Sequence, residues 1–143
     1  MSQEKSTRYL NFTLWVLQVL VAAPMLLGGI LKLGQPVYKL AASYPWMGQV
    51  APAFLRFIGL VDLSGGLGLL LPSLLRLRPI ISAWAAAGVV VLMTCATVFH
   101  ISRGEAGGIG LNIVLALLAA IVAWGRFRKA PLRSKDRDSM RNF

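Results

Sequence analysis

Four stretches of the chain are each long and apolar enough to cross a lipid bilayer. A transmembrane helix needs roughly 20 mostly apolar residues, because the hydrocarbon core is about 30 Å thick. The composition agrees: 57% of the 143 residues are hydrophobic and only 14% are charged, too few to cover a soluble domain. The sequence therefore predicts an all-α integral membrane protein, with spans over residues 14–33, 53–71, 79–99 and 109–124.

The links between these runs predict the topology. PSLLRLRP joins the second run to the third, and HISRGEAGG joins the third to the fourth. Links this short make neighbouring helices antiparallel. The first link, GQPVYKLAASYPWMGQVAP, is longer, and its aromatic residues suit a membrane interface, so we expect it to lie along the surface and to be partly helical. The predicted fold is a transmembrane antiparallel four-helix bundle.

The basic residues predict the orientation. In a soluble protein the net charge of +10 would favour nucleic-acid binding. Here the lysines and arginines gather near the C-terminus and in short links, as in a membrane protein facing an anionic leaflet, so we do not expect nucleic acid as a partner. All but four lie on the side of the termini, which predicts a multi-pass protein of the cytoplasmic (inner) membrane with both termini cytoplasmic. The four exceptions are Lys32, Lys39, Arg56 and Arg103.

These features divide the chain into three parts. Residues 1–13 are predicted to form a cytoplasmic N-terminal segment, and residues 14–126 the four-helix transmembrane domain. Residues 127–143, FRKAPLRSKDRDSMRNF, are too charged to pack in a core, so we expect a basic, disordered cytoplasmic tail.

Small residues recur at helical spacing within the apolar runs. In lipid such residues let helix backbones approach closely, because packing rather than hydrophobic burial drives helix association. We expect them to make the helix contacts, through Ser64, Gly65, Gly66, Gly68, Ala83, Ala87, Ala116 and Ala120.

The order of the sequence motifs resembles the DoxX-like family of small four-helix integral membrane proteins. The matching pieces are GGILKLGQP, RFIGLVDLSGGLGLLLP, VVVLMTCATVFHISRGE and LNIVLALLAAIVAWGR, one for each run, and the likeness covers residues 14–126. The resemblance implies a four-helix bundle in the cytoplasmic membrane and little about activity. The family is named after a subunit of a thiosulfate:quinone oxidoreductase, and some relatives act with redox partners. Such proteins commonly carry Glu where this chain has Asp62, so here the charge is on a shorter side chain.

Polar residues within the runs are the candidates for a site, because polar groups in lipid are costly. Asp62 lies about nine residues, or roughly 14 Å, inside the second run. The topology brings one polar residue of every run to the outer half of the bundle. The predicted intramembrane polar cluster consists of Asp62, Lys32, His100 and Asn112.

Each member of this cluster also has a structural interpretation. Lys32 can extend its ammonium group to the interface, His100 can end its helix among the headgroups, and Asn112 can hydrogen-bond across helices. Asp62 has two alternatives: unpaired it would remain protonated, and paired with Lys32 or a charged His100 it would stay ionised. The sequence does not decide between them.

The remaining motifs leave the activity open. The sequence has no Ser–His–Asp spacing, P-loop or HExxH motif, so no catalytic residue is assigned and an enzyme acting alone is not expected. One His and one Cys suggest neither a metal site nor a cofactor, and Cys95 is expected to be a small buried apolar residue. The favoured hypothesis is a membrane subunit or scaffold for a partner, which is a redox protein, another protein or a second copy of the chain in a homo-oligomer. The alternatives are a small-molecule or quinone site in the outer half of the bundle and, less favoured, a transporter.

Overall fold

The structure, a computed structural model, describes residues 2–129 and 131. All of its regular elements are helices, and four of them are long and apolar enough to cross a membrane. The long helices are α1 (Ser2–Gly34), α3 (Pro52–Leu75), α4 (Ile80–Ser102) and α5 (Ile109–Trp124).

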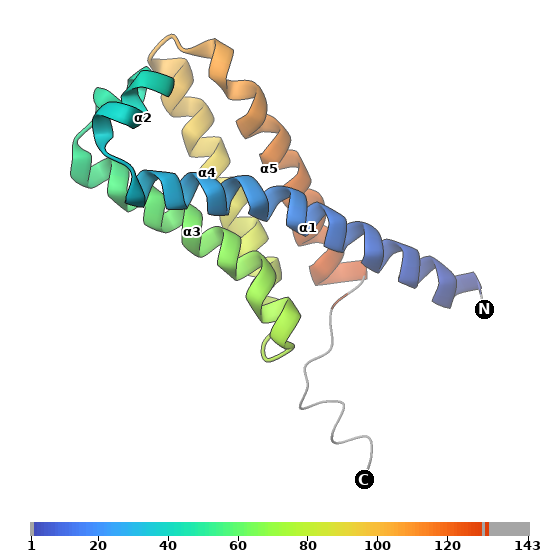
Figure 1. Cartoon of the computed structure of the whole chain (residues 1–143). Coiled ribbons are helices and arrows are strands. Elements are labelled where there is room, and N and C mark those ends of the chain that lie inside the picture. Colours follow the sequence, from blue (N-terminus) through green and yellow to red (C-terminus); the bar gives the residue numbers. More distant parts are fainter. Residues whose placement is uncertain (1, 130, 132–143) are drawn as a thin grey trace.

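The long helices form an antiparallel bundle made of two helix pairs (Figure 1). Helix α1 packs along α3, helix α4 packs along α5, and contacts between α3 and α4 join the pairs. We call one end of the bundle the loop end, where residues 35–51 and 103–108 connect the helices. The opposite end, called the basic end, holds the start of α1, the turn at residues 76–79 and η3 (Gly125–Lys129). The predicted all-α four-helix bundle is confirmed.

Helix α1 is longer than the sequence indicated, because it begins at Ser2 rather than near residue 14. Its 33 residues span roughly 50 Å, well beyond a hydrocarbon core of about 30 Å. The first turns project past the bundle in Figure 1, and Tyr9 and Phe12 on them are 73% and 68% exposed. The polar residues before the apolar run therefore continue the same helix.

The long first link is partly helical, as predicted. It contains α2 (Val37–Ser43) and the short 3₁₀ helix η1 (Pro45–Gly48). Leu40 and Met47 of these helices form a small buried cluster with Leu55 of α3. This cluster holds the link against the loop end of the bundle.

The chain after α5 continues as a short π-helix, η3. Of the predicted tail, the structure describes residues 127–129 and 131, and the rest of the disorder prediction lies outside the described residues.

Glycines set the closest approach within the α1–α3 pair. A Cβ atom on Gly29 would stand 2.8 Å from the backbone nitrogen of Leu63 and 2.9 Å from the carbonyl oxygen of Gly59. Backbone atoms cannot move aside as flexible side chains do, so this contact requires glycine. The sequence analysis did not single out Gly29 and Gly59 as contact residues.

Six of the expected packing residues are at least partly buried, and the other two are exposed. Gly65, Gly66 and Gly68 face side chains of neighbouring helices, and an added Cβ would come within 2.8, 2.7 and 3.1 Å of them. Ala83 is fully buried. Ala87 and Ala116 are half-buried, whereas Ser64 and Ala120 are exposed.

Candidate functional site

Lys32 and Asp62 form an ion pair between α1 and α3. The Lys32 Nζ atom lies 2.7 Å from Asp62 Oδ2, and the two side chains are only 13% and 10% exposed. The close contact of Gly29 with Gly59 explains the pair, because it places the stem of Lys32 against Gly59, one turn before Asp62. Of the alternatives that the sequence left open, the structure has Asp62 paired with Lys32.

Arg56 caps the end of α1 instead of joining this pair. Its guanidinium donates hydrogen bonds to the carbonyl oxygens of Lys32 and, at 2.9 Å, of Gln35. The last carbonyls of a helix lack partners within the helix, and basic side chains satisfy them well. The carboxylate of Asp62 is thus left to Lys32.

His100 pairs with an acid that the sequence analysis did not consider. Its Nδ1 atom lies 2.9 Å from Oε2 of Glu105, and Arg103 donates from Nε to Oε1 of the same carboxylate at 3.1 Å. The hydrogen bond from His100 and the nearby Arg103 keep the pKa of Glu105 below its ordinary value. The available signal was that Glu105 is the single acid in the short link after His100.

Aromatic side chains cover His100 from the first link. Trp46 of η1 stands edge-on to His100, with ring centroids 5.5 Å apart, and to Phe99 at 5.8 Å. Arg103 also donates a hydrogen bond to Gln49, just after η1. Side-chain contacts therefore join the link between α1 and α3 to the link between α4 and α5, next to the polar residues.

The four predicted polar residues line one cavity of about 340 Å³, which we call the ligand cavity. Among the described residues, the Asn112 amide makes no hydrogen bond, so this cavity contains a polar group free to bind a ligand. The other lining side chains are mostly apolar, and three are aromatic: Trp46, Phe54 and Phe99.

A second, larger cavity of about 590 Å³ reaches the ion pair from the side of α1, α2 and α5. It shares Lys32, Trp46, His100 and Asn112 with the ligand cavity. Gly28 lines it beside the pair: a Cβ there would lie 3.3 Å from Lys32 Nζ and 3.7 Å from Asp62 Oδ2. The missing side chain keeps the ion pair accessible from this side.

Cys95 also lines the ligand cavity and is exposed. The prediction that it is buried was wrong, because its position on α4 faces the gap between α3 and α4 instead of the centre of the bundle. The native cysteine is therefore a chemical reporter at the site.

A second group of polar residues lies inside the basic end, and the sequence analysis largely missed it. The side-chain nitrogen of Gln18 donates to the carbonyl oxygen of Leu69 at 2.7 Å and to Ser73 Oγ at 3.3 Å. Ser73 in turn donates to Ser82 at 2.6 Å. Arg126 donates to Gln18 Oε1 at 2.7 Å and to Asn11 Oδ1 at 2.5 Å. We call these residues the basic-end network: Asn11, Gln18, Ser73, Ser82 and Arg126.

A comparison with protein families matches residues 16–122, well over half of the chain, to the model described as the DoxX-like family. The chain belongs to the DoxX-like family. The matched span includes the whole predicted cluster of this DoxX-like protein, but it begins after Asn11 and ends before Arg126 of the basic-end network. No curated protein and no solved structure matches the chain.

In this DoxX-like protein the ligand cavity combines a few polar groups with apolar walls. An ammonium group has three donors, and Asp62 takes one from Lys32. The Asn112 amide offers both donors and an acceptor. Such a site can bind a flat ring that bears hydrogen-bond acceptors.

Proposed function

We propose that this DoxX-like protein is a membrane protein that binds a quinone or a similar ring-bearing small molecule in the ligand cavity. The observation that carries the proposal is the Lys32–Asp62 ion pair at the wall of a cavity with aromatic sides. Its volume of about 340 Å³ is at the lower end of the range for ligand pockets, about 300–1,000 Å³.

The chemistry of the wall suits a quinone head. A ring carbonyl accepts a hydrogen bond from Lys32 Nζ, and the second carbonyl accepts one from the Asn112 amide. Phe99 and Trp46 bound the ring with apolar faces. A charged donor inside an apolar cavity forms a stronger hydrogen bond than it does in water, because little solvent screens it.

The orientation is also a proposal. We infer that the basic end faces the cytoplasm across the inner membrane and that the ligand cavity lies in the outer half, which the distribution of lysines and arginines supports. Single cysteines placed at exposed Ser2 and Ala42 in a Cys95→Ala chain test it. We expect a membrane-impermeant maleimide added to intact cells to label residue 42 only; labelling of residue 2 would contradict the orientation.

Ligand binding is tested with tetramethylbenzoquinone, whose fully substituted ring cannot add a thiol. In purified full-length protein we expect it to slow the alkylation of Cys95 by a maleimide. Lys32→Met should weaken this protection by about tenfold, the loss of one charge-assisted hydrogen bond of about 1.5 kcal/mol.

The matched control is Lys39→Met, which removes an exposed lysine from the same end of the bundle. It should leave the protection within about twofold of the native protein, because exposed charges contribute little. If the quinone never protects Cys95, or if Lys39→Met and Lys32→Met act alike, the proposal is contradicted.

A second candidate function is that of a membrane subunit or scaffold for a redox or other partner protein. The observation that favours it is the projecting start of α1, which presents Tyr9 and Phe12 beyond the bundle. Exposed aromatic side chains are frequent anchors of protein interfaces.

Purification from native membranes in mild detergent tests this candidate. We expect a defined partner to be recovered, and to be lost when Tyr9 and Phe12 are both changed to Ser. Tyr38→Ser is the control, because Tyr38 is 72% exposed at the opposite end. Recovery of the protein alone would contradict the scaffold function, and recovery of a second copy would make it a homo-oligomer.

A further inference from the structure

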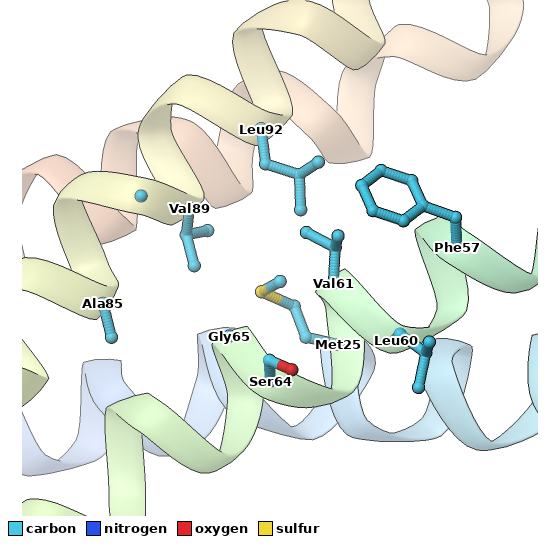
Figure 2. A pocket seen from close by; sticks show the side chains of 10 residues that line it. Met25, Phe57, Leu60, Val61, Ser64, Gly65, Ala85, Val89 and Leu92 are labelled. Carbon is cyan, nitrogen blue, oxygen red and sulfur yellow. The ribbon is translucent and has the colours of Figure 1, made fainter. Parts of the chain in front are cut away.

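An apolar groove runs between α3 and α4, toward the middle of the bundle from the ligand cavity (Figure 2). Its volume is about 480 Å³, and Met25 of α1 lines it between the two helices. Ser64 is the one polar side chain among its ten lining residues. The groove therefore suits hydrocarbon and offers little to a polar group.

The groove and the ligand cavity follow the same seam. Leu92 lines both, so they meet at this residue. On α4, Cys95 and Phe99 follow Leu92 and line the cavity, whereas Ala85 precedes Leu92 and lines the groove. From Leu92 to Ala85 the groove extends over seven residues, or about 10 Å along the helix.

Glycines keep the groove open. Gly65 forms part of its wall on α3, where a Cβ atom would come within 2.8 Å of Met25 Cε. Gly88 lines the opposite wall on α4, and a Cβ atom there would meet no heavy atom within 4 Å. A larger side chain at Gly88 can therefore project from the groove wall without clashing at Cβ.

The continuity of the groove with the ligand cavity favours a single hydrocarbon chain over a partner helix. A helix is at least about 10 Å wide with its side chains, so it would cover the groove from outside and not lie within its volume of about 480 Å³. A hydrocarbon tail is much thinner and can continue directly from a ring in the ligand cavity.

We propose that the ligand is an amphiphile whose hydrocarbon tail lies in the groove between α3 and α4. The inference rests on the proposed ligand site and adds the class of its ligand: a quinone-type head with a long apolar tail. The head contacts Lys32 and Asn112, and the tail passes Leu92 and runs between Gly65 and Gly88.

Two matched probes test the tail. The first is tetramethylbenzoquinone, and the second is the same ring with one methyl group replaced by a decyl chain. For each probe, the concentration that halves the alkylation rate of Cys95 is measured in the detergent-purified full chain. We expect the tailed probe to act at about tenfold lower concentration, because the many small van der Waals contacts of a tail packed against the groove wall add up.

Gly88→Leu is the decisive variant, because its side chain occupies the groove. It should raise the half-protection concentration of the tailed probe about tenfold, since the leucine side chain takes the place of the tail and the contacts of the tail with the groove wall are lost. The tail-less probe should change by less than about twofold, because it makes no contact with the groove. Gly110→Leu on α5 is the control: a Cβ there also meets no heavy atom within 4 Å, and Gly110 does not line the groove.

The outcomes separate the two proposals. If the tail-less probe protects Cys95 but the tail adds nothing, or Gly88→Leu weakens both probes alike, the tail inference is overturned and the ligand site stands. If neither probe protects Cys95 in the native protein, both fail. If Gly88→Leu changes the oligomeric state of the purified protein, the groove joins copies of the chain and the tail inference is likewise overturned.

Discussion

The two ends of the bundle use buried polar residues in opposite ways. In the basic-end network, protein groups satisfy one another: Gln18 and Ser82 are fully buried, and Gln18 bonds to α3 and to Arg126. At the loop end, Lys32 and Asp62 are paired but adjoin two cavities. The polar residues of the basic end thus bind one another, whereas those of the loop end also border space that another molecule can fill.

This difference shows that polarity inside a membrane bundle does not by itself mark a binding site. A side chain whose donors and acceptors are all used inside the protein stabilises helix packing. A side chain with donors left over beside a cavity can recognise another molecule. Stability measurements should therefore respond most to the basic end, and binding measurements to the loop end.

The largest loss of stability is expected from Gln18→Leu at the basic end. This substitution removes the hydrogen-bond partner of Arg126 Nε and of Ser73 Oγ. The free energy of unfolding should therefore fall by about 1.5–3 kcal/mol, the range for hydrogen bonds to charged groups. Thermal denaturation in detergent, followed by circular dichroism, measures it. The control is Gln3→Leu, on an exposed position of the same helix. Equal melting temperatures for the two variants would remove the distinction between the ends.

A smaller loss of stability is expected at the loop end from Asp62→Leu. We expect about 1 kcal/mol, because Lys32 can turn its ammonium group toward a cavity when its partner is gone. Asp62→Asn should lose less, since its amide oxygen still accepts a hydrogen bond from Lys32. If Asp62→Leu loses more stability than Gln18→Leu, the ion pair stabilises the bundle more than the basic-end network does.

Gly28→Ala should affect binding with almost no effect on stability. The new Cβ requires Lys32 Nζ, at 3.3 Å, to shift by a few tenths of an ångström. Quinone binding, measured as protection of Cys95, should weaken by about two- to fivefold, part of one hydrogen bond of about 1 kcal/mol. Gly34→Ala on the same helix meets no atom within 4 Å and should bind normally. Normal binding by Gly28→Ala would show that the lysine does not contact the probe.

The smallest effect is a pH dependence from Glu105. His100 and Arg103 lower the pKa of Glu105 in the folded protein. Ionised Glu105 therefore stabilises the fold at any pH above 4.5, the ordinary pKa of the group. This contribution is lost as the pH falls below 4.5 and through the lowered pKa. Glu105→Gln should slightly lower the melting temperature above pH 6, where the native carboxylate is ionised, and should flatten the acid part of the profile. A profile identical to that of the native protein would show that the carboxylate is not coupled to folding.

The sequence was sufficient for the fold because long apolar runs and short links leave few arrangements in a bilayer. Three of the four spans begin within one residue of their predicted starts, but α1 begins twelve residues early, since a helix need not end where its hydrophobicity does. The sequence also nominated Lys32 and Asp62, because a charge within an apolar run is conspicuous.

What the sequence could not predict depends on distance in three dimensions. Arg126 looked like one of many basic residues after the last span, yet it is only 2% exposed and bonds to Gln18, 108 positions away. Glu105 was overlooked because it lies outside the apolar runs. The groove at Gly88 arises from the spacing of two helices, which no single helix reveals.

The turn at residues 76–79 joins α3 to α4 at the basic end, where Ser73 and Ser82 on either side of it are hydrogen-bonded. At this end the chain itself joins the two helix pairs. Where α3 begins and α4 ends, side-chain contacts join them instead, from Arg103 to Gln49 and from Trp46 to Phe99. A molecule entering the seam at that end has to displace side chains only, whereas at the turn it would meet a covalent connection.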